Sequence, residues 1–222
     1  MKSNTRNFLS GHPDKFLGKL KGVIHVGANI GQEKDLYERY NLNVIWIEPI
    51  PKVYKALRSK IKEYPKQKAY RYLITDKDAS SYHFHVANNF GASSSILRLA
   101  DHKQIWPEVG YEETILMDSI TLTSLCKAKN INMKKYDGLI IDTQGSELMV
   151  LKGAIPLLPY FKFIKTEVPD FNSYKKCCKA DDISAFLTRY NFKEVSKHKF
   201  AHKKNVGSYY KITFKQCNLD YS

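Results

Sequence analysis

A chain of 222 residues with 43% hydrophobic content can bury one sizeable core, and no linker or repeat divides it, so a single domain is expected. No apolar run is long enough to span a bilayer, and residues 1–11 lack the apolar stretch of a signal peptide, which argues against a membrane protein and indicates a cytoplasmic one. The formal net charge of +14 favours anionic ligands. A solvated, lysine-rich surface without a ligand is the alternative.

The first predicted elements are a short buried strand, a glycine turn and a helix. The strand covers residues 23–26, Gly27 lets the backbone turn tightly, and Gly31 lets a ligand approach the start of a helix over residues 32–39. Such a turn builds a nucleotide-sized pocket, but Asn29 stands where the G-x-G-x-x-G pattern has its second glycine. A pyrophosphate needs that bare backbone, so the departure favours a cofactor without phosphates, such as S-adenosylmethionine.

The second strand covers residues 43–48 and ends in an acid. Gly27 and Glu48 are 21 positions apart, the interval expected when one helix separates two parallel strands. An acid at this strand end is placed to accept hydrogen bonds from both hydroxyls of a ribose. We therefore predict that Glu48 binds the cofactor ribose, and a strand-turn-helix without a ligand remains the alternative.

A third strand is expected beyond a helix that Pro51 opens and that runs to about residue 62. Residues 70–74 form its apolar run, which closes at Thr75 and Asp76. In a parallel sheet this end lies beside the first two strand ends, so we expect the adenine next to Thr75 and Asp76.

An edge strand and a polar loop follow. Residues 81–87 alternate polar and apolar side chains, and residues 88–95 contain two asparagines, a glycine and three serines. These residues make a hydrogen-bonding rim, so Ser94 is a candidate to clamp the methionine carboxylate or the substrate. An ordinary capped turn is the alternative.

The least regular segment is 98–117, which we interpret as a lid over the acceptor. His102 is a candidate general base within it, because an imidazole titrates near neutrality. A surface histidine is the alternative. Trp106 and Tyr111 form either a stacking face for a sugar or base, or part of the core.

Two further strands carry candidate catalytic residues. Residues 139–142 form a buried strand that ends in Asp142, where open parallel sheets place their ligands. In the strand over residues 161–168, alternation places Lys165 and Glu167 on one face. We predict that Asp142 and Glu167 orient or deprotonate an acceptor hydroxyl, and that Lys165 stabilises the resulting alkoxide.

The tail predicts an antiparallel ending for the sheet. A helix over residues 181–190 precedes two strands, 192–200 and 207–214. A nucleotide-binding fold of the dinucleotide type would add a parallel strand here instead.

The basic residues are unevenly distributed. Residues 52–77 hold 9 basic and 2 acidic side chains, and residues 171–222 hold 11 and 4. Lysines dominate over arginines, which weakens the case for bidentate recognition of phosphate or guanine. The four cysteines have neither metal-ligand nor disulfide spacing, so no metal site is predicted.

Six segments of the chain have a recognisable pattern, and they are, in order, Gly27–Gly31, Ile47–Pro49, Ser93–Leu97, Ile120–Leu125, Tyr136–Ala154 and Thr166–Val168. In this order they resemble the FkbM family of S-adenosylmethionine-dependent methyltransferases. The family commonly has an aspartate two residues before the first glycine, where this chain has His25, which we keep as a candidate cofactor-binding residue.

The resemblance implies a single α/β domain of the Rossmann-like class I methyltransferase type. Its sheet is expected to have seven mostly parallel strands with a C-terminal antiparallel hairpin. We place this domain at residues 22–216, after a lead-in over residues 1–21 and before a tail over residues 217–222.

The resemblance also implies methyl transfer to a hydroxyl oxygen of a glycan, sugar or small-molecule acceptor, and the charge surplus suits an anionic one. An RNA ribose 2′-O-methyltransferase is the alternative, because Lys21, Asp142, Lys165 and Glu167 resemble the lysine-aspartate-lysine-glutamate set of those enzymes. A non-catalytic relative is a third hypothesis, against which Asn29, Gly31 and Glu48 argue.

Overall fold

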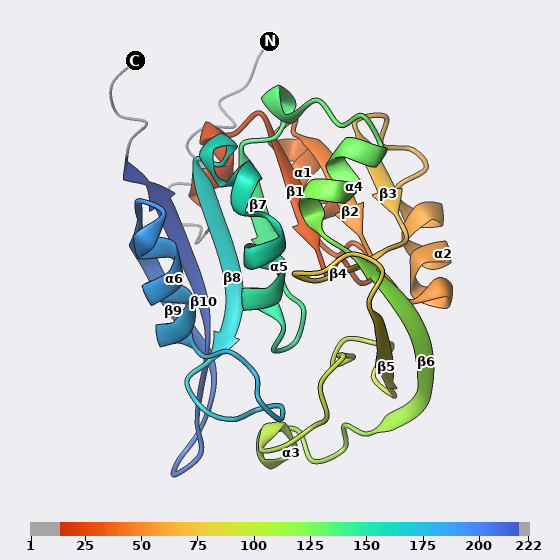
Figure 1. Cartoon of the computed structure of the whole chain (residues 1–222), viewed down its shortest axis with the longest axis vertical. Helices are drawn as coiled ribbons and strands as arrows, with labels where there is room; N and C mark the ends of the chain where they lie inside the picture. Colours follow the sequence, from red (N-terminus) through yellow and green to blue (C-terminus); the bar gives the residue numbers. More distant parts are fainter. Residues whose placement is uncertain (1–13, 218–222) are drawn as a thin grey trace.

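The computed structural model describes residues 14–217, which form a seven-stranded sheet with helices on both faces (Figure 1). The strand order is β3-β2-β1-β7-β8-β10-β9. The first five strands pair in parallel, and β10 pairs antiparallel with both β8 and β9. The expected mostly parallel sheet with its antiparallel ending is thus confirmed. The strands are β1 (Gly22–Val26), β2 (Asn43–Ile47), β3 (Gln67–Tyr70), β7 (Gly138–Ile141), β8 (Phe163–Pro169), β9 (Phe192–Lys203) and β10 (Gly207–Gln216).

Two apolar cores, one on each face, hold the sheet between its helices. Every residue of β1 and β7 is buried, because a parallel strand covered on both faces needs apolar side chains in both directions. One core contains residues of α4, α5 and α6, and the other contains residues of the 3-10 helix η1 and of α1 and α2. The helices are η1 (Lys15–Lys19), α1 (Lys34–Arg39), α2 (Pro51–Lys60), α3 (His102–Ile105), α4 (Leu122–Ala128), η2 (Met133–Lys135), α5 (Glu147–Gly153), η3 (Ile155–Tyr160) and α6 (Ala180–Arg189).

The lead-in predicted over residues 1–21 falls partly outside the described residues. Its described part includes η1, whose Phe16 and Leu17 are buried in the core shared with α1 and α2. The domain boundaries over residues 22–216 stay a prediction.

A separate three-stranded sheet corrects two expectations. It consists of β4 (Leu73–Ile74), β6 (Tyr111–Ile120) and β5 (Ser81–Ala87), in that order. The third strand predicted over residues 70–74 is wrong in its extent, because the chain leaves the main sheet after Tyr70 and Leu73 pairs with β6 instead.

The second correction concerns segment 98–117, which is not a continuous irregular lid. Its last residues begin the ten-residue strand β6, which pairs antiparallel with β5. The strand escaped prediction because half of its side chains are exposed, Leu116 to 65%, and Ser119 alone among its residues is buried, so burial imposes little alternation on its sequence.

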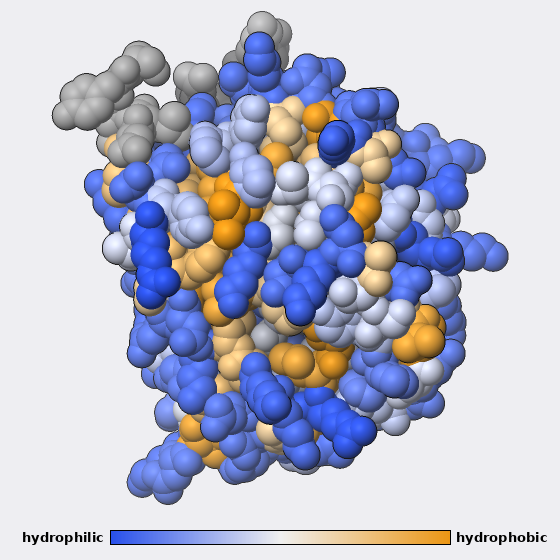
Figure 2. All heavy atoms as spheres, viewed as in Figure 1, coloured by the Kyte–Doolittle hydropathy of each residue, from blue (hydrophilic) through white to orange (hydrophobic). Residues whose placement is uncertain are grey.

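The surface is mainly hydrophilic on the face seen in Figure 2, with hydrophobic residues in separate patches between the hydrophilic ones. Within residues 14–217, no helix has the length and apolar character to cross a membrane. The hairpin of β9 and β10 extends beyond its predicted strands, so that only residues 204–206 connect the two.

Candidate functional site

A cavity of about 270 Å³ opens at the carboxyl ends of β1, β2 and β7. This is the edge at which open parallel sheets bind ligands, and the volume approaches the ~300–1,000 Å³ typical of small-molecule sites. Many residues singled out from the sequence converge on it. Those that line the cavity are His25, Gly27, Asn29, Glu48, Ser94, Asp142 and Glu167.

The turn after β1 forms one wall of this cavity. Gly27 has a φ of 81°, and a Cβ built on it would lie 1.8 Å from the carbonyl oxygen of Asp142. The amides of Gly27 and Ala28 both donate to the Ile47 carbonyl at 3.0 Å. The turn therefore joins the ends of three strands, and only glycine fits at its first position.

Asn29 links this turn to the loop over residues 88–95. Its φ of 45° lies in the left-handed region, which asparagine tolerates better than most residues. Its Nδ2 donates to the Phe90 carbonyl at 3.0 Å, and its Oδ1 accepts from the Ile30 amide at 2.8 Å. Asn29 thus shapes the wall through its side chain as well as its backbone.

Glu48 is held firmly at the edge of the cavity. One carboxylate oxygen accepts from the Asn29 amide at 2.9 Å and the other from the Ile50 amide at 2.8 Å. The side chain is buried, and this burial raises the pKa of Glu48 to about 7 although the two backbone bonds act against it. Each oxygen keeps a further acceptor site, which suits a diol such as the ribose of a nucleoside.

Other predicted cofactor contacts lie outside the cavity. Gly31 packs on α2, since a Cβ there would lie 2.7 Å from Leu57 Cδ1. The Thr75 hydroxyl bonds to the backbone of Lys77, and neither Thr75 nor Asp76 lines the cavity. Because β3 ends at Tyr70, residues 72–74 line the cavity in place of Thr75 and Asp76. The apolar side chains that line this part of the cavity are Ile50, Tyr72, Leu73, Ile74 and Phe84.

His25 lies on β1 within an aromatic group. Its ring stacks on Trp46 with centroids 5.1 Å apart, and its Nδ1 lies 3.1 Å from the Tyr37 hydroxyl. Burial lowers the pKa of His25, so the imidazole is neutral near pH 7. At the position where the family commonly has an aspartate, this chain therefore presents an uncharged ring.

Asp142 lines this cavity and is held by Gln144, a residue that the sequence analysis missed. Gln144 Nε2 donates to Asp142 Oδ1 at 2.6 Å, while Gln144 Oε1 accepts from the Tyr174 hydroxyl at 2.8 Å. Burial, and then the nearby carboxylates of Glu167 and Glu147, raise the pKa of Asp142 well above its usual range. A carboxyl group in this state can hold or accept a proton near neutral pH.

The predicted partner of the acids, Lys165, faces a smaller cavity of about 70 Å³ and forms an ion pair with Asp14. Lys211 of β10 lines the main cavity instead, and its Nζ lies 2.5 Å from Glu167 Oε1. Burial alone would lower the pKa of Lys211, but the Glu167 carboxylate raises it overall. The pair follows from the register of β8 and β10, which places Lys211 directly opposite Glu167.

A third cavity, of about 280 Å³, adjoins the first and shares Asp142, Gln144 and Glu167 with it. His102 lines it but is 2% exposed, and its two ring nitrogens lie 2.6 Å from the Tyr209 hydroxyl and 3.1 Å from Ser93 Oγ. Burial lowers the pKa of His102 to about 4. It is therefore an engaged, neutral side chain rather than an exposed residue titrating near neutrality.

The loop over residues 88–95 separates the first cavity from the third, and Ala92 lines both. Ser94 faces the first, and its Oγ accepts from the Ala87 amide at 2.9 Å. Of the two aromatic residues singled out earlier, Trp106 lines the third cavity, whereas Tyr111 stacks on His85 with centroids 4.8 Å apart.

Within residues 14–217, no group of three or more histidine, cysteine, aspartate or glutamate side chains is arranged to hold a metal ion. All four cysteines are free thiols.

A family model described as the methyltransferase FkbM domain matches residues 25–194. No curated protein matches the sequence. Among solved structures, the chain resembles an uncharacterized protein from Listeria monocytogenes serotype 4b, with a TM-score of 0.50 and 9% identity over 92% of this chain and 68% of that one. At this identity, the resemblance concerns the fold alone.

Two structures with bound S-adenosylmethionine are also similar. Magnesium protoporphyrin IX methyltransferase from Synechocystis has a TM-score of 0.46 and 11% identity over 88% of this chain and 69% of that one. Aeropyrum pernix fibrillarin has a TM-score of 0.46 and 9% identity over 87% and 66%.

Proposed function

The chain belongs to the FkbM methyltransferase family, and we propose that it transfers the methyl group of S-adenosylmethionine to a hydroxyl oxygen of a sugar, glycan or small-molecule acceptor. The observation that carries this proposal is the meeting of two cavities at Asp142 and Glu167. One cavity has the features of a nucleoside site, and the other is free for an acceptor. A transferase needs two such adjoining spaces.

The residues of the first cavity fit S-adenosylmethionine. We assign the ribose hydroxyls to Glu48 and the adenine to the apolar side chains around Ile74 and Phe84. The tight turn at Gly27 leaves its backbone open to the ligand, and Ser94 on the opposite loop is our candidate for the methionine end. Bound here, the cofactor supplies a methyl group that is already activated as a sulfonium.

The remaining chemistry falls to the residues shared by the two cavities. We assign to Asp142 the role of base, because its raised pKa suits it to take the proton of an acceptor hydroxyl near neutral pH. Gln144 fixes the Asp142 carboxyl by their hydrogen bond. The Glu167–Lys211 pair orients the acceptor and stabilises negative charge that develops on its oxygen. Alignment of the reacting groups is the main contribution of the protein.

RNA ribose methylation is the second candidate, and one observation favours it. Two lysines and two acids, Lys165, Lys211, Asp142 and Glu167, line the small cavity together. Both lysines are already paired, Lys165 with Asp14 and Lys211 with Glu167, which leaves neither ready for a phosphate. Lys21, the fourth residue of the sequence-based set, is exposed and does not line this cavity.

Methyl-labelled cofactor tests the proposal. The protein is incubated with paired pools of glycans, nucleotide-sugars and RNA, and alkali-resistant label in each pool is counted. Label in a glycan or sugar pool that depends on Asp142, with Asp142→Asn as the variant, supports the proposal. Label only in RNA establishes the second candidate, and absence of cofactor binding by calorimetry establishes a non-catalytic relative.

A further inference from the structure

The third cavity has the composition of a binding site for an uncharged polyhydroxylated ring. Its wall contains Trp106, Tyr209 and Phe200; the Trp106 and Tyr209 rings have centroids 5.0 Å apart, and the Phe200 and Tyr209 rings 5.9 Å apart. The faces of aromatic rings carry partial negative charge and attract the C–H groups of a sugar ring. Figure 1 shows the elements around this wall, α3 and the β9–β10 hairpin, at the end of the molecule to which β8 points.

Several polar groups of the same cavity are neutral hydrogen-bonding groups. Asn89 and Gln144 contribute side-chain amides, and Ser93 and Ser173 contribute hydroxyls. Amides and hydroxyls both donate and accept, so they match sugar hydroxyls, which also do both. His102 adds no charge at neutral pH, because burial lowers its pKa to about 4.

The charges of the cavity disfavour an anion. Three of its lining residues are acids, Glu108, Asp142 and Glu167, and none of the described lining residues is a lysine or an arginine. The nearest described cation of the adjoining site, Lys211, is paired with Glu167. A phosphate or carboxylate bound in this cavity would lose its hydration and lie close to acids. No lysine or arginine among the described lining residues would balance its charge, so its binding would cost free energy.

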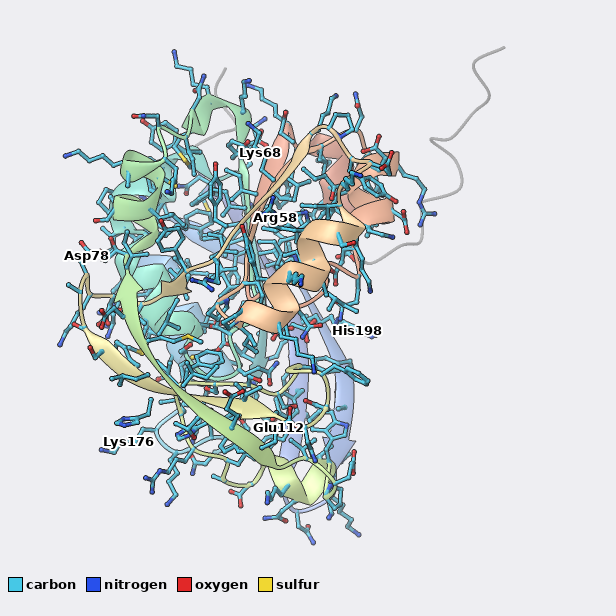
Figure 3. All side chains as sticks on the ribbon, turned by 90° about the vertical axis from the view of Figure 1, so that its right-hand side faces the viewer. Arg58, Lys68, Asp78, Glu112, Lys176 and His198 are labelled. Atoms are coloured by element: carbon cyan, nitrogen blue, oxygen red, sulfur yellow. The ribbon has the colours of Figure 1, made fainter. Side chains whose placement is uncertain are left out.

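One of the two basic segments predicted to attract anionic acceptors, residues 52–77, lies away from the third cavity. Figure 3 views the side of the molecule on which α2 and β3 lie, and it places Arg58 and Lys68 there. Both side chains are exposed, and neither lines the third cavity. The positive charge of residues 52–77 therefore says little about the acceptor.

We propose that the third cavity is the acceptor site, and that the acceptor unit bound there is a sugar ring without phosphate or carboxylate groups. This inference rests on the proposed function for its chemistry, but binding in the cavity can be measured without the cofactor. It replaces the anionic acceptor that the charge of the sequence favoured.

Tryptophan fluorescence reports on this cavity directly. The chain has two tryptophans, of which Trp46 is fully buried in the core and Trp106 lines the cavity. Titration of the full chain with methyl β-glucopyranoside is expected to change the emission, with a Kd around 1 mM for so small a ligand. The change should vanish in Trp106→Phe. Glucose 6-phosphate and glucuronate should bind about tenfold more weakly or not at all.

A charge-reversal variant sharpens the test. Glu108→Lys alters an exposed residue of the cavity lining, so it should narrow or reverse the preference for the neutral sugar. Equal or tighter binding of the phosphorylated sugar to the unaltered protein overturns the inference. So does the absence of any Trp106-dependent signal with the neutral sugar.

Calorimetry with S-adenosylhomocysteine keeps the two proposals apart. If the cofactor product binds and only anionic acceptors are methylated, the acceptor inference fails while the proposed function stands. If the neutral sugar binds but the cofactor product does not, the proposed function fails and the cavity assignment stands.

Discussion

The space where a side chain of Gly27 would begin is filled by the backbone of Asp142, whose carbonyl oxygen lies 1.8 Å from the position of a Cβ. The cofactor turn and the candidate catalytic strand are thus packed backbone to backbone. A side chain at position 27 must therefore displace the backbone of Asp142.

Gly27→Ala is therefore expected to lower the free energy of unfolding by about 2–4 kcal/mol, from the clash and from the left-handed φ of 81° together. Urea denaturation measures the loss. Gly110→Ala is the matched control, because the nearest atom to its added Cβ would be 4.0 Å away. Equal stability of the two variants would show that the turn is not packed as described.

Glu48→Ala should weaken binding of S-adenosylhomocysteine by about 1.5–3 kcal/mol, the range for hydrogen bonds to a charged group. Isothermal titration calorimetry gives the affinity, and circular dichroism checks the fold. Glu38→Ala removes an exposed carboxylate from α1 and should leave the affinity unchanged. Wild-type affinity in a folded Glu48→Ala protein would remove Glu48 from the ribose site.

The raised pKa of Glu48 predicts a pH dependence of cofactor binding. With a pKa of about 7, Glu48 is mostly protonated at pH 6 and mostly ionised at pH 8 in the free protein. Only the ionised form offers both oxygens as acceptors, so affinity should rise as the pH passes 7 and then level off. Calorimetry from pH 5.5 to 8.5 measures the rise, which should flatten in Glu48→Gln. An affinity that falls with pH would contradict the assignment.

The sequence was sufficient to place a site residue where one strand and the turn after it determine the position of that residue. Gly27, Asn29, Glu48 and Asp142 each follow an apolar strand, and the parallel sheet brings their ends to one edge. The buried strands β1 and β7 were predicted from their apolar runs, whereas the seven-stranded sheet was expected from the resemblance to the FkbM family.

The sequence did not reveal the contacts that depend on pairing between distant parts of the chain. Lys165 and Lys211 lie on adjacent strands of similar composition, and only the β8–β10 register reveals that Lys211 faces Glu167 within the main cavity. The burial of His102, a candidate general base with a surface histidine as the alternative, could not be predicted, because its partners Ser93 and Tyr209 come from two other parts of the chain.

Gln144 escaped notice because its role depends on a backbone angle. Its φ of 54° turns its side chain to both Asp142 and Tyr174, and nothing in the sequence marks that conformation. A Thr-Gln-Gly turn is unremarkable in sequence, although its glycine permits a positive φ.

Asp142 allows a prediction that separates stability from activity. Because burial raises its pKa above the usual value, the folded protein binds this proton more tightly than the unfolded chain does, and stability is lost as the pH rises through the folded-state pKa. Asp142→Asn removes the charge but keeps an oxygen for Gln144, so it should stabilise the protein by about 1–2 kcal/mol at pH 8 and by less at pH 5. Urea denaturation at the two pH values measures both gains, and Glu113→Gln, which alters an exposed acid on β6, should show neither.

Methyl transfer should fall by about 100-fold or more in Asp142→Asn, because the amide cannot take the acceptor proton. A variant that is no more stable at pH 8 would contradict the raised pKa, and one that keeps full activity would remove Asp142 as the base.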